Sequence, residues 1–419
     1  MENLGLVNVL YTLNVGFFFF IVVWTAVYIT KFFNLGWYNP FTIVLAFILP
    51  MLIMRVIVAP AFLFEEGMFD EWFNYALAMH NIELLITFFI IFFVFNALNK
   101  RRYLQWRLLN IFKPRKLPRK NMIFLACFFL SCSLFCFLIL TREFGFINWL
   151  SDPREGYQFY RRGNGHWYAL SIVFWSVSFF IILNQSKNLL QACLLFVIGF
   201  LYSYFFGSKE IMLEALICFA IIVWFKNFKN AKKIILLLAA PTILAMLYNL
   251  GRTHIEGIIA YFDYYQVSAM YYQAYHNGEI DLFYGNVWVT DFYHYIPRFL
   301  YSDKPYVYGQ ILVNEFLFPG MAEASHTPGL GGPVAKFADF GVFGVVLFTL
   351  FDATLIFTTV ITFLLFSSYK KGVINSNGFL IYLILYAPVF LKYFPPLLAI
   401  IMFFLIFLVV VNFNRVRVY

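Results

Sequence analysis

Long apolar stretches recur along the chain and predict helices that cross a membrane. A helix needs about 20 consecutive, mostly apolar residues to span the hydrocarbon core of a bilayer. Windows of that kind lie at 6–30, 41–63, 73–97, 122–140, 167–184, 189–206, 210–225, 234–250, 341–366, 378–393 and 397–413. The pattern predicts an all-α polytopic membrane protein with eleven transmembrane helices, or twelve if one span escapes the hydropathy pattern.

One connection is much longer than the others and divides the chain. Residues 251–340 separate the eighth and ninth windows, and loops longer than about 12–15 residues are usually functional or disordered. This segment is rich in aromatic residues, which argues against disorder. We therefore expect helices 1–8 in 1–250, a large external working region in 251–340, and helices 9–11 in 341–419. The first window lacks a preceding basic segment and a cleavage site, so we expect a retained helix.

Composition supports a membrane protein, and the distribution of charge predicts which connections face the cytoplasm. The chain is 63% hydrophobic and 12% charged, which excludes a soluble cytosolic protein and a disordered one. Residues 99–121 carry nine basic and no acidic side chains, and 226–233 carry four and none. Segments rich in Lys and Arg stay cytoplasmic. Alternating from these two segments also places the following residues inside: Lys31, Lys187, Lys370, Lys371, Arg415 and Arg417.

The net charge of +9 therefore belongs to one face. Its expected partner is the anionic lipid headgroup layer of the membrane, and not nucleic acid. The five cysteines all lie in apolar runs, which argues against disulfides and zinc sites. The acidic segment 65–71 matches no metal-ligand spacing, so we predict no metal and no cofactor.

Four charged residues fall inside predicted spans: Arg55, Glu83, Glu214 and Asp352. A charge in a bilayer is costly unless it is paired or hydrated, so such residues mark either functional sites or internal ion pairs that fix helix packing. Both interpretations remain open for these four.

The middle of the long external segment gathers reactive side chains. Residues 285–309 contain Asp291, His294, Arg298 and Lys304, and a helix would place the first three on one face. Pro297 makes one unbroken helix doubtful. A carboxylate beside a histidine suits a general base, and an arginine offers a planar fork for phosphate oxygens. A surface salt-bridge cluster would have the same composition.

Further candidates lie elsewhere on the predicted external face. These are Arg252 after the eighth window, Glu323 and His326 near the end of the long segment, Arg161 and Arg162 before the fifth window, and Lys209 in a tight GSKE turn. Each has an ordinary alternative as a polar loop or turn residue. A helix over 261–275 would align Tyr261, Tyr265, Tyr272 and Tyr275, either facing the membrane interface or stacking on sugar.

The layout, the GSKE turn, an IPRFLYSDKP stretch and a PGLGGPVAKFADFGVFG stretch before the ninth window together resemble Wzy-type oligosaccharide repeat-unit polymerases of bacterial O-antigen and capsule clusters. Members of that family often have an even number of spans with both termini inside. This chain departs from that pattern, with eleven predicted spans and an external amino terminus.

The resemblance implies a glycosyltransferase of the bacterial inner membrane whose active site faces the periplasm and joins undecaprenyl-diphosphate-linked glycans. It implies no nucleotide sugar or other cofactor, and it allows a chain-length regulator protein as a partner. For this reaction we expect His294, oriented by Asp291, as the base, with His326 and Glu323 in reserve. Arg252 and Arg298 are the first choices for binding diphosphate, followed by Lys304, Arg161, Arg162 and Lys209. An O-antigen ligase, a lipid-linked oligosaccharide flippase and a membrane acyltransferase are the alternatives.

Overall fold

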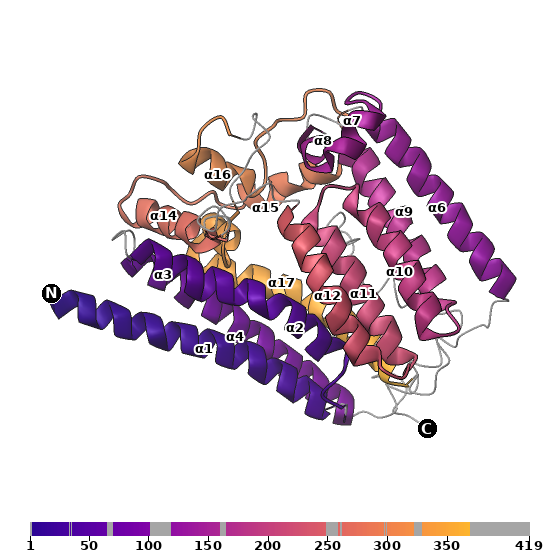
Figure 1. The fold of residues 1–419 in the computed structure, drawn as a ribbon. Helices are drawn as coiled ribbons and strands as arrows, with labels where there is room; N and C mark the ends of the chain where they lie inside the picture. The colour runs from indigo at the N-terminus through magenta and orange to yellow at the C-terminus, as the bar shows by residue number, and fades with distance from the viewer. Residues whose placement is uncertain are drawn as a thin grey trace, which may run out of the picture.

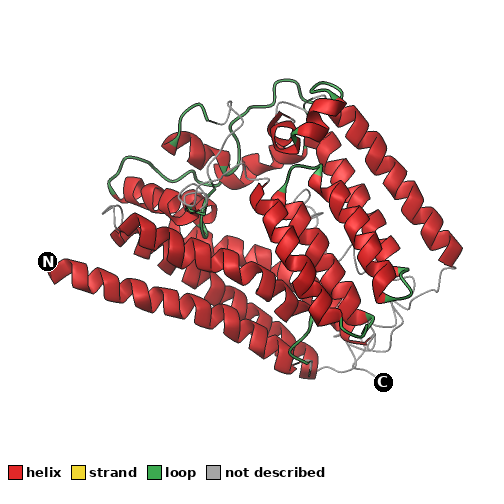
Figure 2. Ribbon diagram, in the orientation of Figure 1, coloured by secondary structure: helices red, strands yellow, loops and turns green. Residues whose placement is uncertain are grey.

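The computed structural model of the chain describes residues 2–32, 36–64, 70–100, 119–159, 165–248, 262–296, 300–321 and 329–368, together with 34, 259 and 298. Every regular element within these ranges is helical (Figure 2). Long tilted helices form the body of the molecule, and short helices gather at one end of it (Figure 1).

Within the described residues, six helices are long and apolar enough to cross a membrane. Their apolar stretches are Val7–Phe32, Phe41–Phe62, Glu71–Phe93, Arg119–Thr141, Gly165–Asn184 and Val334–Asp352. Three further helices occupy predicted windows but are shorter: α10 (Leu189–Tyr204), α11 (Lys209–Phe225) and α12 (Ala231–Tyr248). The predicted spans at 378–393 and 397–413 lie outside the described residues. The membrane-protein class is thus supported, and the count of eleven spans stays a prediction.

The helices pack around two hydrophobic cores. The first joins α6 (Arg119–Thr141), α9 (Gly165–Asn184), α10, α11 and α12 around buried aromatic side chains such as Trp149 and Phe219. The second joins α1 (Glu2–Phe32), α4 (Asp70–Lys100), α14 (Tyr264–His276) and α17 (Val334–Ser368). Outward-facing leucine and phenylalanine side chains cover the long helices, as expected for a protein whose solvent is lipid.

The second predicted span contains an irregularity. α2 (Pro40–Ile53) continues through a π-helical turn, η1 (Met54–Val58), into α3 (Ala59–Phe64). Pro50 lies inside α2, where its ring removes a backbone donor, and wide turns of this kind are frequent at functional sites. The π turn carries Arg55, one of the charges that fall inside predicted spans.

The basic turns that we predicted to be cytoplasmic meet at one end of the molecule. The Arg119 guanidinium donates to the carbonyl oxygen of Gln185 at 3.2 Å. The Lys226 ammonium donates to the carbonyl oxygen of Ser186 at 2.6 Å. The short helices α7 (Phe146–Ser151), α8 (Pro153–Phe159), α15 (Asn286–Thr290) and α16 (Ile311–Leu317) lie at the opposite, upper end of Figure 1.

α14 is packed inside the protein, which makes the expected interfacial helix wrong for Tyr265 and Tyr272. These two rings are 2% and 0% exposed, and they contact α4 and α17 instead of lipid or sugar. Small residues explain the fit, because Ser268 bonds the backbone of Gly331 on the chain that leads into α17. Tyr275 is partly buried against Phe337, and Tyr261 lies outside the described residues.

α17 begins earlier than the predicted ninth span and is broken near its start. It starts at Val334 instead of 341, and Phe340 and Gly341 have non-helical backbone angles. The predicted ninth span begins at 341, which leaves 334–340, with the charged residues Lys336 and Asp339, in the preceding loop. Both charges have partners in the structure, so the segment can form a short leading half-helix, Val334–Asp339.

Candidate functional site

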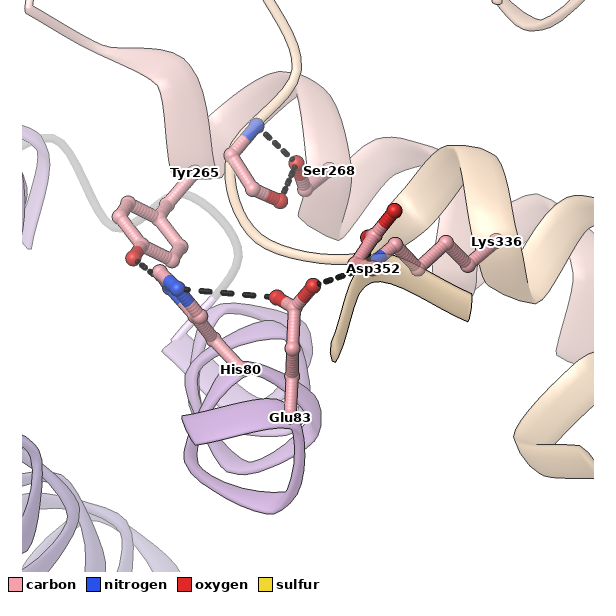
Figure 3. A network of polar contacts seen from close by, with 7 residues as sticks. His80, Glu83, Tyr265, Ser268, Lys336 and Asp352 are labelled. Carbon is pink, nitrogen blue, oxygen red and sulfur yellow. Dashed lines mark hydrogen bonds and ion pairs between the residues drawn. The ribbon is translucent and has the colours of Figure 1, made fainter. Parts of the chain in front are cut away.

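Two of the four charges inside predicted spans, Glu83 and Asp352, belong to one polar network with its centre on Lys336 (Figure 3). The Lys336 ammonium lies 2.6 Å from the Glu83 carboxylate of α4 and also bonds the Asp352 carboxylate of the long half of α17. Lys336 and Glu83 are 21% and 18% exposed, whereas Asp352 is 47% exposed. The lysine therefore neutralises two acids that would otherwise be unpaired at membrane depth.

The network continues from Glu83 to α14 through His80. The His80 Nε2 atom lies 3.7 Å from Glu83, and its Nδ1 atom is hydrogen-bonded to the Tyr265 phenol. Burial raises the pKa of the Tyr265 phenol above its usual value, so the phenol stays protonated beside Nδ1. This hydrogen bond leaves Nε2 facing the carboxylate. The chain of contacts links α4, α14 and α17.

Arg55 lies beside this network. Its guanidinium stands over the Tyr264 ring at 4.1 Å, and its Nε atom is buried without a hydrogen-bond partner among the described residues. A cation over an aromatic face is stabilised by the ring quadrupole. The structure thus brings three of the four intramembrane charges to one region, and Glu214 lies elsewhere on α11.

The glycine-rich stretch before α17 fits tightly against the same region. A Cβ atom on Gly329 would overlap the Tyr264 ring, and one on Gly331 would stand 3.0 Å from the Tyr264 backbone. Gly332 has a φ of +67° and faces His80. These glycines let the backbone approach α14 and α4 closely, which a residue with a side chain would prevent.

A second cluster forms in the segment between α14 and α16. Asp291 begins a 3-10 helix, η3 (Asp291–Tyr295), and the backbone places His294 one turn later. The His294 side chain lies outside the described residues. η3 ends before Arg298, because Ile296 is extended as expected for a residue that precedes proline. The single helix carrying all three residues is therefore absent.

The chain instead folds back so that Asp291, Arg298 and Lys304 surround Tyr308. Lys304 lies 4.8 Å from the Tyr308 ring centroid, and the charges of Arg298 and Asp291 both act on this phenol. A Cβ atom on Gly309, whose φ is +58°, would overlap the Asp291 carboxylate. Burial raises the pKa of the Asp291 carboxyl above its usual value.

Two cations in this cluster bond backbone carbonyls and, within the described part of the chain, no carboxylate. The Arg298 guanidinium donates to the carbonyl oxygens of Lys304 at 2.5 Å and Pro305 at 3.3 Å, and it lies over the Tyr306 ring at 3.9 Å. The Lys304 ammonium donates to the carbonyl oxygen of Ile296 at 3.1 Å. Burial, and then the charge of Arg298, lower the pKa of Lys304 to about 8.

The GSKE turn is held from several sides. Gly207 has a φ of +66°, and a Cβ atom there would overlap the carbonyl oxygen of Pro153. The Trp149 indole donates to the carbonyl oxygen of Phe205 at 2.7 Å. Lys209 begins α11, and its ammonium lies 5.9 Å from the Phe262 ring centroid, near the start of α14. The turn therefore contacts the long segment 251–340.

The remaining predicted site residues lie outside the described part of the chain: Arg161, Arg162, Arg252, Glu323 and His326. Sequence reasoning missed His80 and Lys336 as site residues. The available signal was that two intramembrane acids require a cation. Among the described residues, no group of three or more His, Cys, Asp or Glu side chains could hold a metal ion.

Two distinct arrangements thus emerge. One is the paired network within the candidate spans, and the other is the cluster of Asp291, Arg298, Lys304 and Tyr308, in which the two cations form no ion pair among the described residues. We call it the outer cluster, because its segment is predicted to be external. The paired network can couple movements of the helices that it links or carry protons between them. The cations of the outer cluster can bind an anion. Comparisons with protein-family models, curated proteins and solved structures find no match for this chain.

Proposed function

We propose that this protein is a glycosyltransferase that polymerises undecaprenyl-diphosphate-linked oligosaccharide repeat units at the periplasmic face of a bacterial inner membrane. The observation that supports this most is the pair Arg298 and Lys304, which have no acidic partner among the described residues. Two neighbouring cations that form no ion pair with a described carboxylate favour a bound anion, and the diphosphate of a lipid carrier supplies one.

The contacts of both side chains leave donors for such a ligand. A guanidinium has five N–H donors and an ammonium has three. The carbonyl contacts of Arg298 use two of its donors, and the contact of Lys304 with Ile296 uses one. The same contacts fix the two side chains, so they would bind the anion without a large cost of ordering.

In the proposed reaction, the hydroxyl oxygen of an acceptor sugar bonds to the anomeric carbon of the donor glycan, and the bond from that carbon to the diphosphate oxygen breaks. Negative charge develops on the departing undecaprenyl diphosphate, where Arg298 and Lys304 stabilise it. The hydroxyl proton passes to a base, for which His294 next to Asp291 is the candidate. General base catalysis of this kind contributes about 10²–10⁴-fold.

The most direct test is deletion of the gene in its host, scored by the banding of extracted lipopolysaccharide. Loss of the ladder with retention of a single attached repeat unit would support a polymerase. Loss of all attached glycan would instead indicate a ligase, and trapping of the lipid-linked unit on the inner face would indicate a flippase. An unchanged ladder would refute the proposal.

Complementation with variants then tests the cationic pair. We expect Arg298→Ala to abolish long-chain polymer while the protein still reaches the membrane. Arg142→Ala is the matched control, because Arg142 is an exposed cation in the turn after α6, outside the cluster. Arg298→Lys keeps the charge and should retain partial activity. Full-length polymer from Arg298→Ala would contradict its role in binding diphosphate.

His294→Ala tests the base separately. We expect shorter or absent polymer, because the acceptor hydroxyl would lose its proton acceptor. Asp291→Asn should act in the same direction, since it removes the neighbouring carboxylate charge. Normal chain length in both variants, with Arg298→Ala inactive, would show that transfer proceeds without this base.

A further inference from the structure

A cavity of about 340 Å³ lies at the basic end of the molecule, away from both clusters described above. It is formed by the turn between α11 and α12 together with Tyr38, which precedes α2. Volumes of this size are at the lower end of those that bind small ligands. Its wall and its rim differ in chemistry, and together they define what it could hold.

The rim is cationic. Lys232 and Lys233 line the cavity and are exposed, and Lys226 and Lys229 belong to the same turn. No carboxylate pairs with any of these four ammonium groups among the described residues. Burial, and then the charge of Arg119, lower the pKa of Lys226 to about 8, as expected where basic residues gather without acids.

The neighbouring turns at this end also lack acidic residues. The turns at 31–40 and 185–188, which meet the same end, contain no acidic residue. The same is true of the sequences 101–118 and 369–419, which lie outside the described residues. Among the described residues no carboxylate pairs with Lys232 or Lys233, so an anion from another molecule can neutralise them.

The wall is aromatic. Tyr38, Trp224 and Phe228 line the cavity, and the Lys232 ammonium lies 5.2 Å from the Tyr38 ring centroid. The neighbouring Trp37 is 66% exposed. Tryptophan and tyrosine are enriched where a membrane meets water, because their rings have an apolar body and a polar edge. An aromatic wall beside a cationic rim matches the acyl and phosphate parts of an anionic lipid.

We propose that this cavity binds one anionic glycerophospholipid of the cytoplasmic leaflet. The lipid phosphate would lie between Lys232 and Lys233, with the glycerol and the first acyl carbons against Tyr38, Trp224 and Phe228. The site is independent of the glycosyltransferase proposal, because no residue of it belongs to the outer cluster. It differs from diffuse attraction to the membrane surface in being saturable by a single lipid.

The test uses the purified full-length protein in a non-ionic detergent after removal of native lipid. Native mass spectrometry would count bound molecules as phosphatidylglycerol, phosphatidylcholine or inorganic phosphate is added. We expect one saturable phosphatidylglycerol, weaker binding of phosphatidylcholine, and no displacement by inorganic phosphate at equal concentration. Displacement by inorganic phosphate would indicate a soluble phosphate ester as the ligand and overturn the proposal.

Variants distinguish specific binding in the cavity from a general effect of positive charge at this end of the molecule. Lys232→Gln/Lys233→Gln should weaken phosphatidylglycerol binding about 30-fold, from about 1 kcal/mol for each lysine near the lipid phosphate. Lys187→Gln/Lys229→Gln removes equal charge at the same end from residues that do not line the cavity, and should change binding less than about twofold. Lys232→Arg/Lys233→Arg should retain binding. Equal losses in the two glutamine pairs, or lost binding in the arginine pair, would overturn the proposal.

Discussion

Replacing Lys336 by methionine should destabilise the protein strongly, because it leaves Glu83 and Asp352 facing each other without a cation. Removing one partner of a buried ion pair costs about 3–5 kcal/mol, since the remaining charge stays desolvated. Glu83 is 18% exposed and bears this penalty, whereas Asp352 is 47% exposed and is screened more. We therefore expect a loss of about 3 kcal/mol, at the lower end of that range.

The assay is unfolding of the purified protein in mixed micelles with an increasing fraction of denaturing detergent, followed by tryptophan fluorescence. The informative comparison is Lys336→Met/Glu83→Gln/Asp352→Asn, which removes all three charges and keeps the side-chain sizes. Replacing a whole buried ionic group is often nearly neutral. The triple variant should therefore recover most of the stability that Lys336→Met loses. A single variant within about 1 kcal/mol of the wild type, or a triple variant as unstable as the single, would refute this explanation.

Three further outcomes follow from individual contacts. Gly207→Ala should lower the midpoint of thermal unfolding clearly, because its φ is +66° and a Cβ overlaps Pro153, whereas Gly16→Ala, in open space within α1, should be neutral or stabilising. Asp339→Ala should cost about 2 kcal/mol in the same measurement, since its carboxylate accepts three backbone N–H groups at the start of α15. Lys304 has a pKa of about 8, so polymerising activity should fall as pH rises through 8, and stability should rise over the same interval because the folded state releases this proton first. Lys304→Arg should remove both pH effects, and an unchanged alkaline limb would contradict the assignment.

The membrane class and most of the helix positions could be predicted from the sequence, because hydropathy depends on short windows of the chain. The basic turns also meet at one end, as their charge indicated. The start of α17 was missed for a specific reason. The charges of Lys336 and Asp339 lower the mean hydropathy of any window that contains them. Only the folded structure shows the partners that compensate for the burial of these charges.

The candidate site was predicted in part. The sequence indicated that Glu83 and Asp352 needed a partner, but Lys336 is 253 positions away from Glu83, and no local pattern connects them. Whether the tyrosines of α14 are buried or face the membrane interface also could not be predicted from a single sequence. A stripe of tyrosines at helical spacing is the same for a membrane interface and for a protein core, and the burial of Tyr265 and Tyr272 depends on what packs against them.

The leading half of α17 joins two parts of the molecule over three residue steps. Lys336 bonds the spans, whereas Asp339 accepts from the backbone of Gly285, Val287 and Trp288 at the edge of the outer cluster. Since a helix advances about 100° per residue, inserting one alanine between these two positions would turn one attachment away from its partners while the other stayed in place. Length changes at 337–338 should therefore be far less tolerated than substitutions there, because the register of this short segment determines whether α4 and the start of α15 can both bond to α17.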